Sequence, residues 1–330
     1  MMNKLCLATN GDFYKDAPSA VCVEGARIAL LNEKARNATD PLSEGEVLYG
    51  YMPPEDVLKY ETLYASFGEA GSLAFSLWDF HGYISAYAVF ERVMGKRYGA
   101  VLFSEKSLDE SADILKRIAQ DKDEREGLVM LLHSVDDESL DDKTMTSLTD
   151  VREVFRQTVS RGRDCIASRI VVSQRDSIEA ADAFFVPVPQ RTLVQLILLL
   201  ACAVDAVSKS RSIRVSLSVE KERTRISMTT TVADLSARVG DLEGLSAAFP
   251  EARELFSTFG FVAETGRASV SVATSEDMRG LCCTVSLDKT EYREGDFRSR
   301  ASQISVKEDV DFVKAHVRAL LRKCKGEGQE

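Results

Sequence analysis

The sequence predicts an α+β protein of several domains: an antiparallel sheet with helices, a helical hairpin, and then an α/β sandwich. Strand-like runs separated by turns fill residues 14–104, and apolar residues at helical spacing mark residues 106–172. Residues 193–220, "LVQLILLLACAVDAVSKSRSIRVSLSVE", join a long apolar helix to an alternating strand. We expect domains over 1–105, 106–175 and 176–290, with a C-terminal helical extension over 291–330.

Net charge, apolar runs and cysteine pattern argue against several classes of protein. A net charge of -10 and a pI near 5.1 argue against a nucleic-acid partner, because phosphate affinity comes from clustered lysine and arginine. The N-terminal residues lack the apolar run of a signal peptide, and the longest apolar run, 196–204, is far shorter than the roughly 20 residues of a membrane span. Seven cysteines without a CxxC pair suit reduced thiols, so we expect a cytoplasmic protein with no metal site and no membrane span.

The N-terminal third begins with two short apolar strands in "APSAVCVEGARIALLNEKA", joined by a tight turn at Glu24-Gly25. A short helix is expected to open near Asn32, and "PPEDVLKYETLYASF" predicts another. Three further strands follow, with turns at His81-Gly82 and Gly95-Lys96. The pattern predicts an antiparallel meander.

This order of two strands, short helices and three strands resembles a PAS domain over residues 14–104. The resemblance implies either a small-ligand cavity inside the sheet or a unit that only dimerises and relays signals. Trp78, His81 and Tyr83, with Phe80, are the candidates to line such a cavity. The alternative is that these aromatic residues are core and that His81 is a solvated turn residue rather than a haem ligand.

The middle segment predicts two helices, over 106–135 and 142–172. In the second helix Leu148, Val151, Phe155, Val159, Cys165 and Ile166 share one face. The acidic "SVDDESLDDKT" between the helices suits a hairpin turn. An amphipathic helix pair needs a partner, so we expect a four-helix bundle with a second chain, and hence a homodimer.

Residues 184–288 resemble the ATPase domain of histidine kinases: a helix ending in Asp-Ala, two alternating strands flanking "EKERT", then a closing helix, a hairpin and a final strand. The segment 106–175 then corresponds in position to that family's dimerisation and phosphoacceptor hairpin. Its only histidine, His133, is the phosphoacceptor candidate. The family's acidic neighbour is replaced by Ser134, and no proline follows.

The resemblance also implies a nucleotide site, and this sequence departs from it at three places. Cys202 stands where the histidine-kinase family has a magnesium-binding asparagine, and sulfur is a poor ligand for a hard cation. Asp234 matches the adenine-binding aspartate, but Ser236 and Arg238 stand in place of the glycines that follow it. The segment 239–256 has Gly240 and Gly244 but no GxGxG. Asp205 also matches a common family residue, with no role implied.

Two interpretations follow. The first is a cytoplasmic signal-transduction dimer that has kept the kinase fold, has lost its ATP chemistry and acts through partner contacts, with a response regulator or another kinase as the possible partner. The alternative is an active, divergent sensor histidine kinase that phosphorylates itself on His133; only this reading requires ATP and magnesium as cofactors. A metabolic enzyme finds no supporting motif. An apolar stripe over 306–321 predicts a final helix that packs on its own domain or on a partner.

Overall fold

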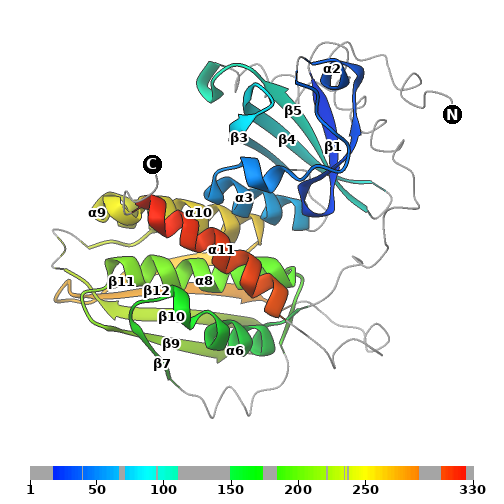
Figure 1. Cartoon of the computed structure of the whole chain (residues 1–330). Helices are drawn as coiled ribbons and strands as arrows, with labels where there is room; N and C mark the ends of the chain where they lie inside the picture. Colours follow the sequence, from blue (N-terminus) through cyan, green and yellow to red (C-terminus); the bar gives the residue numbers. More distant parts are fainter. Residues whose placement is uncertain are drawn as a thin grey trace, which may run out of the picture. The chain divides into compact units, whose positions relative to one another are not determined.

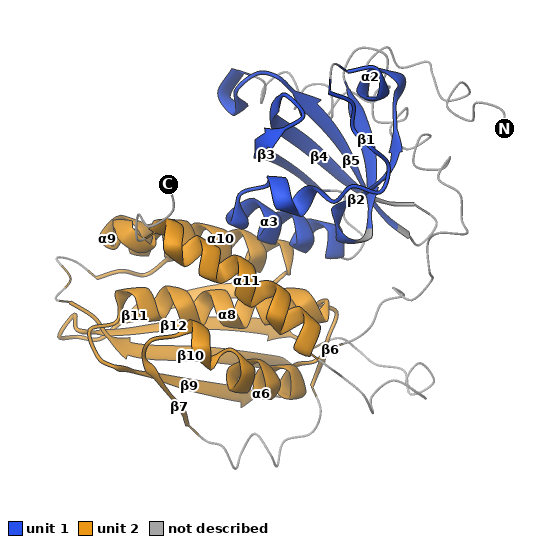
Figure 2. Cartoon of the chain, viewed as in Figure 1, with its two compact units in different colours: residues 1–145 blue, residues 146–330 orange. Residues whose placement is uncertain are grey.

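The computed structural model describes residues 18–38, 40–66, 71–93, 96–110, 149–173, 184–220, 222–233, 235, 238–289 and 306–324. The chain divides into two compact units, residues 1–145 and residues 146–330, coloured separately in Figure 2. Both units mix helices with sheet, as the sequence predicts.

Unit 1 contains a five-stranded antiparallel sheet in the order β2-β1-β5-β4-β3. Its elements are β1 (Ser19–Val23), η2 (Glu24–Ala26), β2 (Arg27–Leu31), α2 (Glu33–Arg36), η3 (Leu48–Tyr51), α3 (Pro54–Ala65), β3 (Gly71–Phe80), β4 (Tyr83–Val93) and β5 (Lys96–Ser104). The order of strands and helices is therefore the one predicted for residues 14–104.

Local chemistry explains the turns of unit 1. Gly25 has a φ of 68°, a conformation that glycine adopts without strain, and this permits the tight connection from β1 to β2. The side chain of Asn32 accepts hydrogen bonds from the backbone N–H of Ala35 at 2.9 Å and of Ser19 at 3.0 Å. The first bond caps α2 and the second ties the helix start to β1.

The core of unit 1 is aromatic. The ring of Tyr60, on α3, lies 4.8 Å from that of Phe90 and 6.1 Å from that of Phe75, centre to centre. Gly99, on β5, leaves room for this tyrosine, since a Cβ there would lie 2.7 Å from the Tyr60 hydroxyl oxygen. These contacts fix α3 against one face of the sheet.

Unit 2 contains a mixed five-stranded sheet in the order β11-β12-β10-β9-β7, in which β7 and β9 are parallel and the other pairs antiparallel. Its strands are β6 (Thr149–Asp150), β7 (Arg169–Ser173), β8 (Phe185–Val186), β9 (Ser212–Val219), β10 (Arg223–Thr231), β11 (Ser269–Thr274) and β12 (Gly280–Asp288). Its helices are α6 (Val151–Arg161), η6 (Arg163–Cys165), α8 (Gln190–Val207), α9 (Leu242–Ala248), η7 (Pro250–Ala252), α10 (Arg253–Thr265) and α11 (Lys307–Cys324). The short strands β6 and β8 pair with each other.

Alternation along the strands decides which face of the sheet is covered. In β12 Cys283 is buried while Cys282 is half-buried, so one thiol points inward and one outward. Figure 1 shows α6, α8 and α10 on one face of the sheet, with α11 across the helices. By length and composition α8 could cross a membrane, a test that the core helix of a soluble protein also passes, and 78% of it is buried inside the structure.

The continuous helix predicted over 142–172 is wrong in its second half. Helix α6 ends at Arg161, and residues 169–173 form β7 instead. The chain turns there because the β-branched run "RIVVS" favours a strand. The first predicted helix, 106–135, lies almost wholly outside the described residues.

The apolar face of α6 is also used within unit 2. Val151, Val154, Phe155 and Val159 are buried, and the helix packs on α8. Phe155 is therefore a core residue of the unit. The part of the predicted hairpin that the structure describes thus belongs with the sheet.

Helix α11 forms from the predicted apolar stripe and packs on α8 in its own unit. Val306, Val310, Val313, Val317 and Leu320 are all fully buried. The Asp309 carboxylate accepts hydrogen bonds from Gln190 at 2.7 Å and Arg191 at 2.8 Å, both at the start of α8. Further along α11, Lys314 and Arg318 form ion pairs with Asp164, which lies on η6.

Candidate functional site

The region expected to hold a nucleotide is centred on α8. Every residue from 192 to 204 is buried, because α6, α10, α11 and β10 surround the helix. Over this length α8 therefore has no open side for a nucleotide.

Cys202 lies in this buried stretch and is 1% exposed. Its Sγ lies 3.7 Å from the carbonyl oxygen of Cys165. Burial, with smaller contributions from Cys165 and Asp205, raises the pKa of this thiol well above its usual range. A neutral, buried thiol is a poor ligand for magnesium, which prefers oxygen.

Asp205 stands one turn further along α8 and is only half-buried. Its two oxygens accept hydrogen bonds from the backbone N–H groups of Ala167 at 2.8 Å and Ser168 at 2.9 Å. These bonds hold the segment that leads into β7. Asp205 thus connects α8 to the sheet edge.

The loop expected to contact adenine is described only in part. Asp234 and Ser236 lie outside the described residues, and Arg238 is exposed. Asp241 begins α9 by accepting a hydrogen bond from the N–H of Gly244 at 2.7 Å. One of the N–H donors at this helix start is therefore already bonded to a side chain.

The described residues of this region do not form a recognisable magnesium or phosphate site. Within those residues no group of three or more His, Cys, Asp or Glu side chains could hold a metal ion. Gly240 and Gly244 have no left-handed φ, so neither marks a loop that needs glycine for its backbone conformation. We derive no phosphoryl-transfer step from this unit.

The candidates for a ligand cavity in unit 1 are dispersed. Trp78 is 52% exposed, whereas Tyr83 is buried, with its ring 5.2 Å from that of Phe103. Burial, with the Glu105 charge, raises the pKa of Tyr83. The structure therefore does not place Trp78 and Tyr83 together in one enclosed site.

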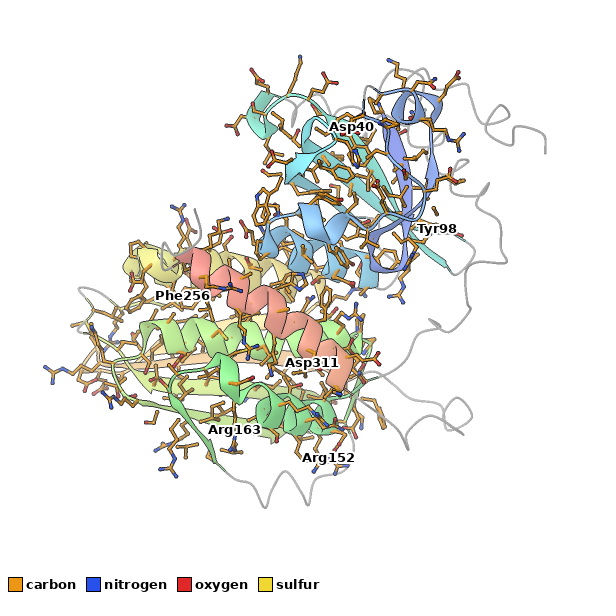
Figure 3. The ribbon with its side chains drawn as sticks, in the orientation of Figure 1. Asp40, Tyr98, Arg152, Arg163, Phe256 and Asp311 are labelled. Carbon is orange, nitrogen blue, oxygen red and sulfur yellow. The ribbon has the colours of Figure 1, made fainter. Side chains whose placement is uncertain are left out.

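His81 lies in the turn between β3 and β4 with a φ of 50°. Its Nδ1 lies 3.2 Å from a carboxylate oxygen of Asp40 and its Nε2 lies 3.3 Å from one of Glu46. Figure 3 labels Asp40 in unit 1. Both ring nitrogens thus face carboxylates, and this residue joins the turn to the loop after α2. The predicted phosphoacceptor His133 lies outside the described residues.

Comparison with known proteins finds likeness only at the level of structure. No protein-family model matches the chain, and no curated protein sequence matches it. A mycobacterial sensor histidine kinase, MprB, matches 45% of this chain and 100% of its own at 11% identity and a TM-score of 0.33. The Acinetobacter baumannii histidine kinase AdeS matches 56% of this chain and 98% of its own, at 10% identity and a TM-score of 0.33.

A third similar structure is full-length ShkA in complex with AMPPNP. It matches 56% of this chain and 38% of its own, at 16% identity and a TM-score of 0.33. The structural neighbours are thus histidine kinases or their catalytic domains. At these identities and TM-scores the likeness is weak and concerns the arrangement of helices and strands only.

Proposed function

We propose that this chain is a signal-transduction protein in which a PAS-like sensor unit is joined to a histidine-kinase-like unit that does not use ATP. Such a protein acts by changing its contacts with partners, as a homodimer and with a response regulator or another kinase as the partner. We also propose that it works in the cytoplasm, because its cysteines suit reduced thiols.

The burial of α8 is the observation that carries the proposal. Residues 192–204 offer no accessible side chain, and both oxygens of Asp205 are bonded to backbone N–H groups. Magnesium prefers oxygen ligands with free lone pairs in octahedral geometry. The substitution of glycine by Arg238 in the predicted adenine loop supports the same conclusion from an independent part of the unit.

The sensor half of the proposal is supported by the element order of unit 1. Two strands, short helices and three strands follow one another as the PAS resemblance implies. The dimer is supported by the predicted helix over 106–135 and not by α6, whose apolar face packs on α8.

Thermal unfolding in the presence of millimolar ATP and magnesium tests the loss of ATP chemistry. A ligand at 100 times its dissociation constant would stabilise the folded state by about 2.7 kcal/mol, so binding of useful affinity is visible as a rise in melting temperature. We expect no rise. A saturable rise that requires magnesium would instead favour the active kinase.

A second experiment addresses His133. Acid-labile phosphate is measured on wild type and His133→Ala after incubation with ATP, with and without a competent histidine kinase in the same tube. We expect no label, because the residue has no acidic neighbour to accept its proton. Label on wild type alone would overturn the proposal, while label that needs the added kinase would make the protein a phosphate relay.

A further inference from the structure

Strand β7 forms an open edge of the sheet in unit 2. It pairs with β9 on one side, and no strand among the described residues pairs with its other side. The backbone N–H of Arg169 donates to the carbonyl oxygen of Arg211 at 2.8 Å, so alternate amides along β7 point toward β9. The N–H and C=O groups of Ile170 and Val172 therefore point toward the open edge.

This edge lacks several of the devices that usually protect one. Its sequence, "RIVVS", has no proline and no lysine, and the β7–β9 register contains no bulge. Val171 projects outward and is 41% exposed, while Ile170 and Val172 are half-buried. An unprotected strand with an exposed valine is a template for another strand.

The charge around the edge indicates what kind of strand fits. Arg169, Lys209, Arg211 and Arg214, which we call the basic edge, are all exposed. Among the described residues none of the four side chains has an ion pair or hydrogen bond. The register places Arg214 beside Val171.

Among the described residues, carboxylates are missing from the same surface; residues 174–183, which follow β7 and include Asp176, Glu179 and Asp182, lie outside them. No acidic residue occurs between Asp164 and β7 or between Asp205 and Glu220. The nearest acids are engaged elsewhere: Asp164 with Lys314 and Arg318, Asp205 with backbone amides, and Glu220 with Arg225 at 2.9 Å. In a chain of net charge -10 this is a local cationic surface.

We infer that β7 is a docking site for an extended acidic segment of a partner protein, which adds to the sheet as a further strand. The backbone groups of Ile170 and Val172 supply the main-chain hydrogen bonds, Val171 contacts an apolar side chain, and the basic edge binds carboxylates. A nucleic acid would use the same cations, but its backbone could not pair as a strand does with both the N–H and the C=O groups of the edge. The inference does not depend on whether the protein binds ATP.

The test uses the full chain and a fluorescein-labelled peptide of alternating glutamate and valine, about nine residues long, in an anisotropy titration. A peptide with lysine in place of glutamate and a single-stranded oligonucleotide of similar length are the comparison probes. We expect saturable binding of the acidic peptide that weakens with salt, and no binding of the lysine peptide.

Two variants separate backbone pairing from charge. Val172→Pro removes an edge donor while leaving the amides that face β9, and it should weaken acidic-peptide binding about tenfold or more. Arg214→Glu leaves the backbone unchanged and should weaken binding at least about threefold, whereas Arg253→Glu, an equal charge change on α10, should have no effect. Circular dichroism checks folding, and if Val172→Pro does not fold, the two charge variants decide.

Failure of wild type to bind the acidic peptide would overturn the inference, as would equal binding by Arg214→Glu and Arg253→Glu. Tight oligonucleotide binding that a folded Val172→Pro retains would also overturn it, because the surface would then recognise anionic polymers without strand addition.

Discussion

Gly162 ends α6 at the point where that helix touches α8. A Cβ at this position would clash with Cδ2 of Leu198 and lie 2.9 Å from the carbonyl oxygen of Thr158. The backbone of Gly162 does not need a left-handed φ, so its requirement for glycine is one of space. The packing of α6 on α8 thus depends on a missing side chain.

The variant Gly162→Ala should therefore lower the free energy of unfolding by about 1–3 kcal/mol through overpacking. The matched control is Gly240→Ala, where nothing lies within 4 Å of the added Cβ, and its effect should stay within about 1 kcal/mol. Urea unfolding followed by circular dichroism measures both. Equal midpoints for the two variants would show that α6 can shift away from α8 at no cost.

Asp205 acts at the same scale by holding the chain that enters β7. In Asp205→Ala the N–H groups of Ala167 and Ser168 lose their acceptor, which should cost about 1–3 kcal/mol of stability. The amides of both residues should exchange hydrogen faster, while amides in the middle of α8 keep their protection. Unchanged exchange at Ala167 and Ser168 would contradict this role.

At the scale of elements, α3 contains an acidic residue, Asp56, whose ionised form is less favourable in the folded protein than in the unfolded chain. Burial raises the pKa of Asp56 to about 6, with a smaller raising effect from Glu55, although Lys59 at 3.5 Å and the backbone N–H of Ser76 oppose it. The protonated carboxyl is thus the form that the folded helix prefers. The stabilisation of the folded state by protonated Asp56 is fully present below about pH 4 and is lost as pH rises through about 6.

Asp56→Asn imitates the protonated form, so it should stabilise the protein at neutral pH and have little effect near pH 4. The expected gain above pH 6 is about 1–3 kcal/mol. The difference in melting temperature between variant and wild type, measured from pH 4 to pH 8, checks the trend. Asp164→Asn should behave oppositely and destabilise at neutral pH, because bonding to Lys314 lowers the pKa of Asp164. A flat difference for Asp56→Asn would contradict the assigned cause.

Helices and strands whose apolar residues repeat with a clear period could be predicted from the sequence. The neighbour that covers each helix face, and the residue at which each element ends, could not. The runs that form α8, β9 and β10 alternate or repeat strongly enough to define each element. The strand β7 is five residues long and follows an amphipathic helix, so its apolar residues continue a helical spacing by coincidence. Asp205 bonds to a segment 37 residues earlier in the chain, a contact that local patterns do not encode.

The candidate site shows the same limit. The resemblance to the histidine-kinase ATPase domain shows that Cys202 replaces an asparagine, but it does not show that the Cys202 side chain lies in the core. Because α8 is apolar on every side, its sequence alone cannot show which neighbour covers which face. The uniform hydrophobicity of 196–204 was nevertheless a signal that no face of this stretch would meet solvent.

At the scale of the whole molecule, the compact units do not coincide with the four predicted segments. Residues 149–173 and 306–324 pack in the same unit as the mixed sheet. Boundaries near residues 175 and 290 would each remove a helix that covers α8.

A fragment of residues 146–330 should therefore unfold cooperatively, whereas a fragment of residues 146–290 should not. The shorter fragment leaves uncovered the side of α8 that α11 contacts, so we expect it to bind the dye ANS and to lose near-ultraviolet circular dichroism. Calorimetry and dye binding on both fragments provide the test. A cooperative transition and no dye binding in the shorter fragment would show that α11 is dispensable.

The position of α11 in the chain also affects how the protein is made. Helix α8 ends at Val207 and α11 begins at Lys307, so a ribosome completes the most apolar helix of the unit long before it delivers the cover. During that interval β10 and α10 can cover part of α8, but the side that α11 contacts stays exposed on the nascent chain. Vectorial synthesis at ordinary rates of about 5–20 residues per second extends this interval to several seconds, and apolar surface exposed for that time favours aggregation unless a chaperone binds it.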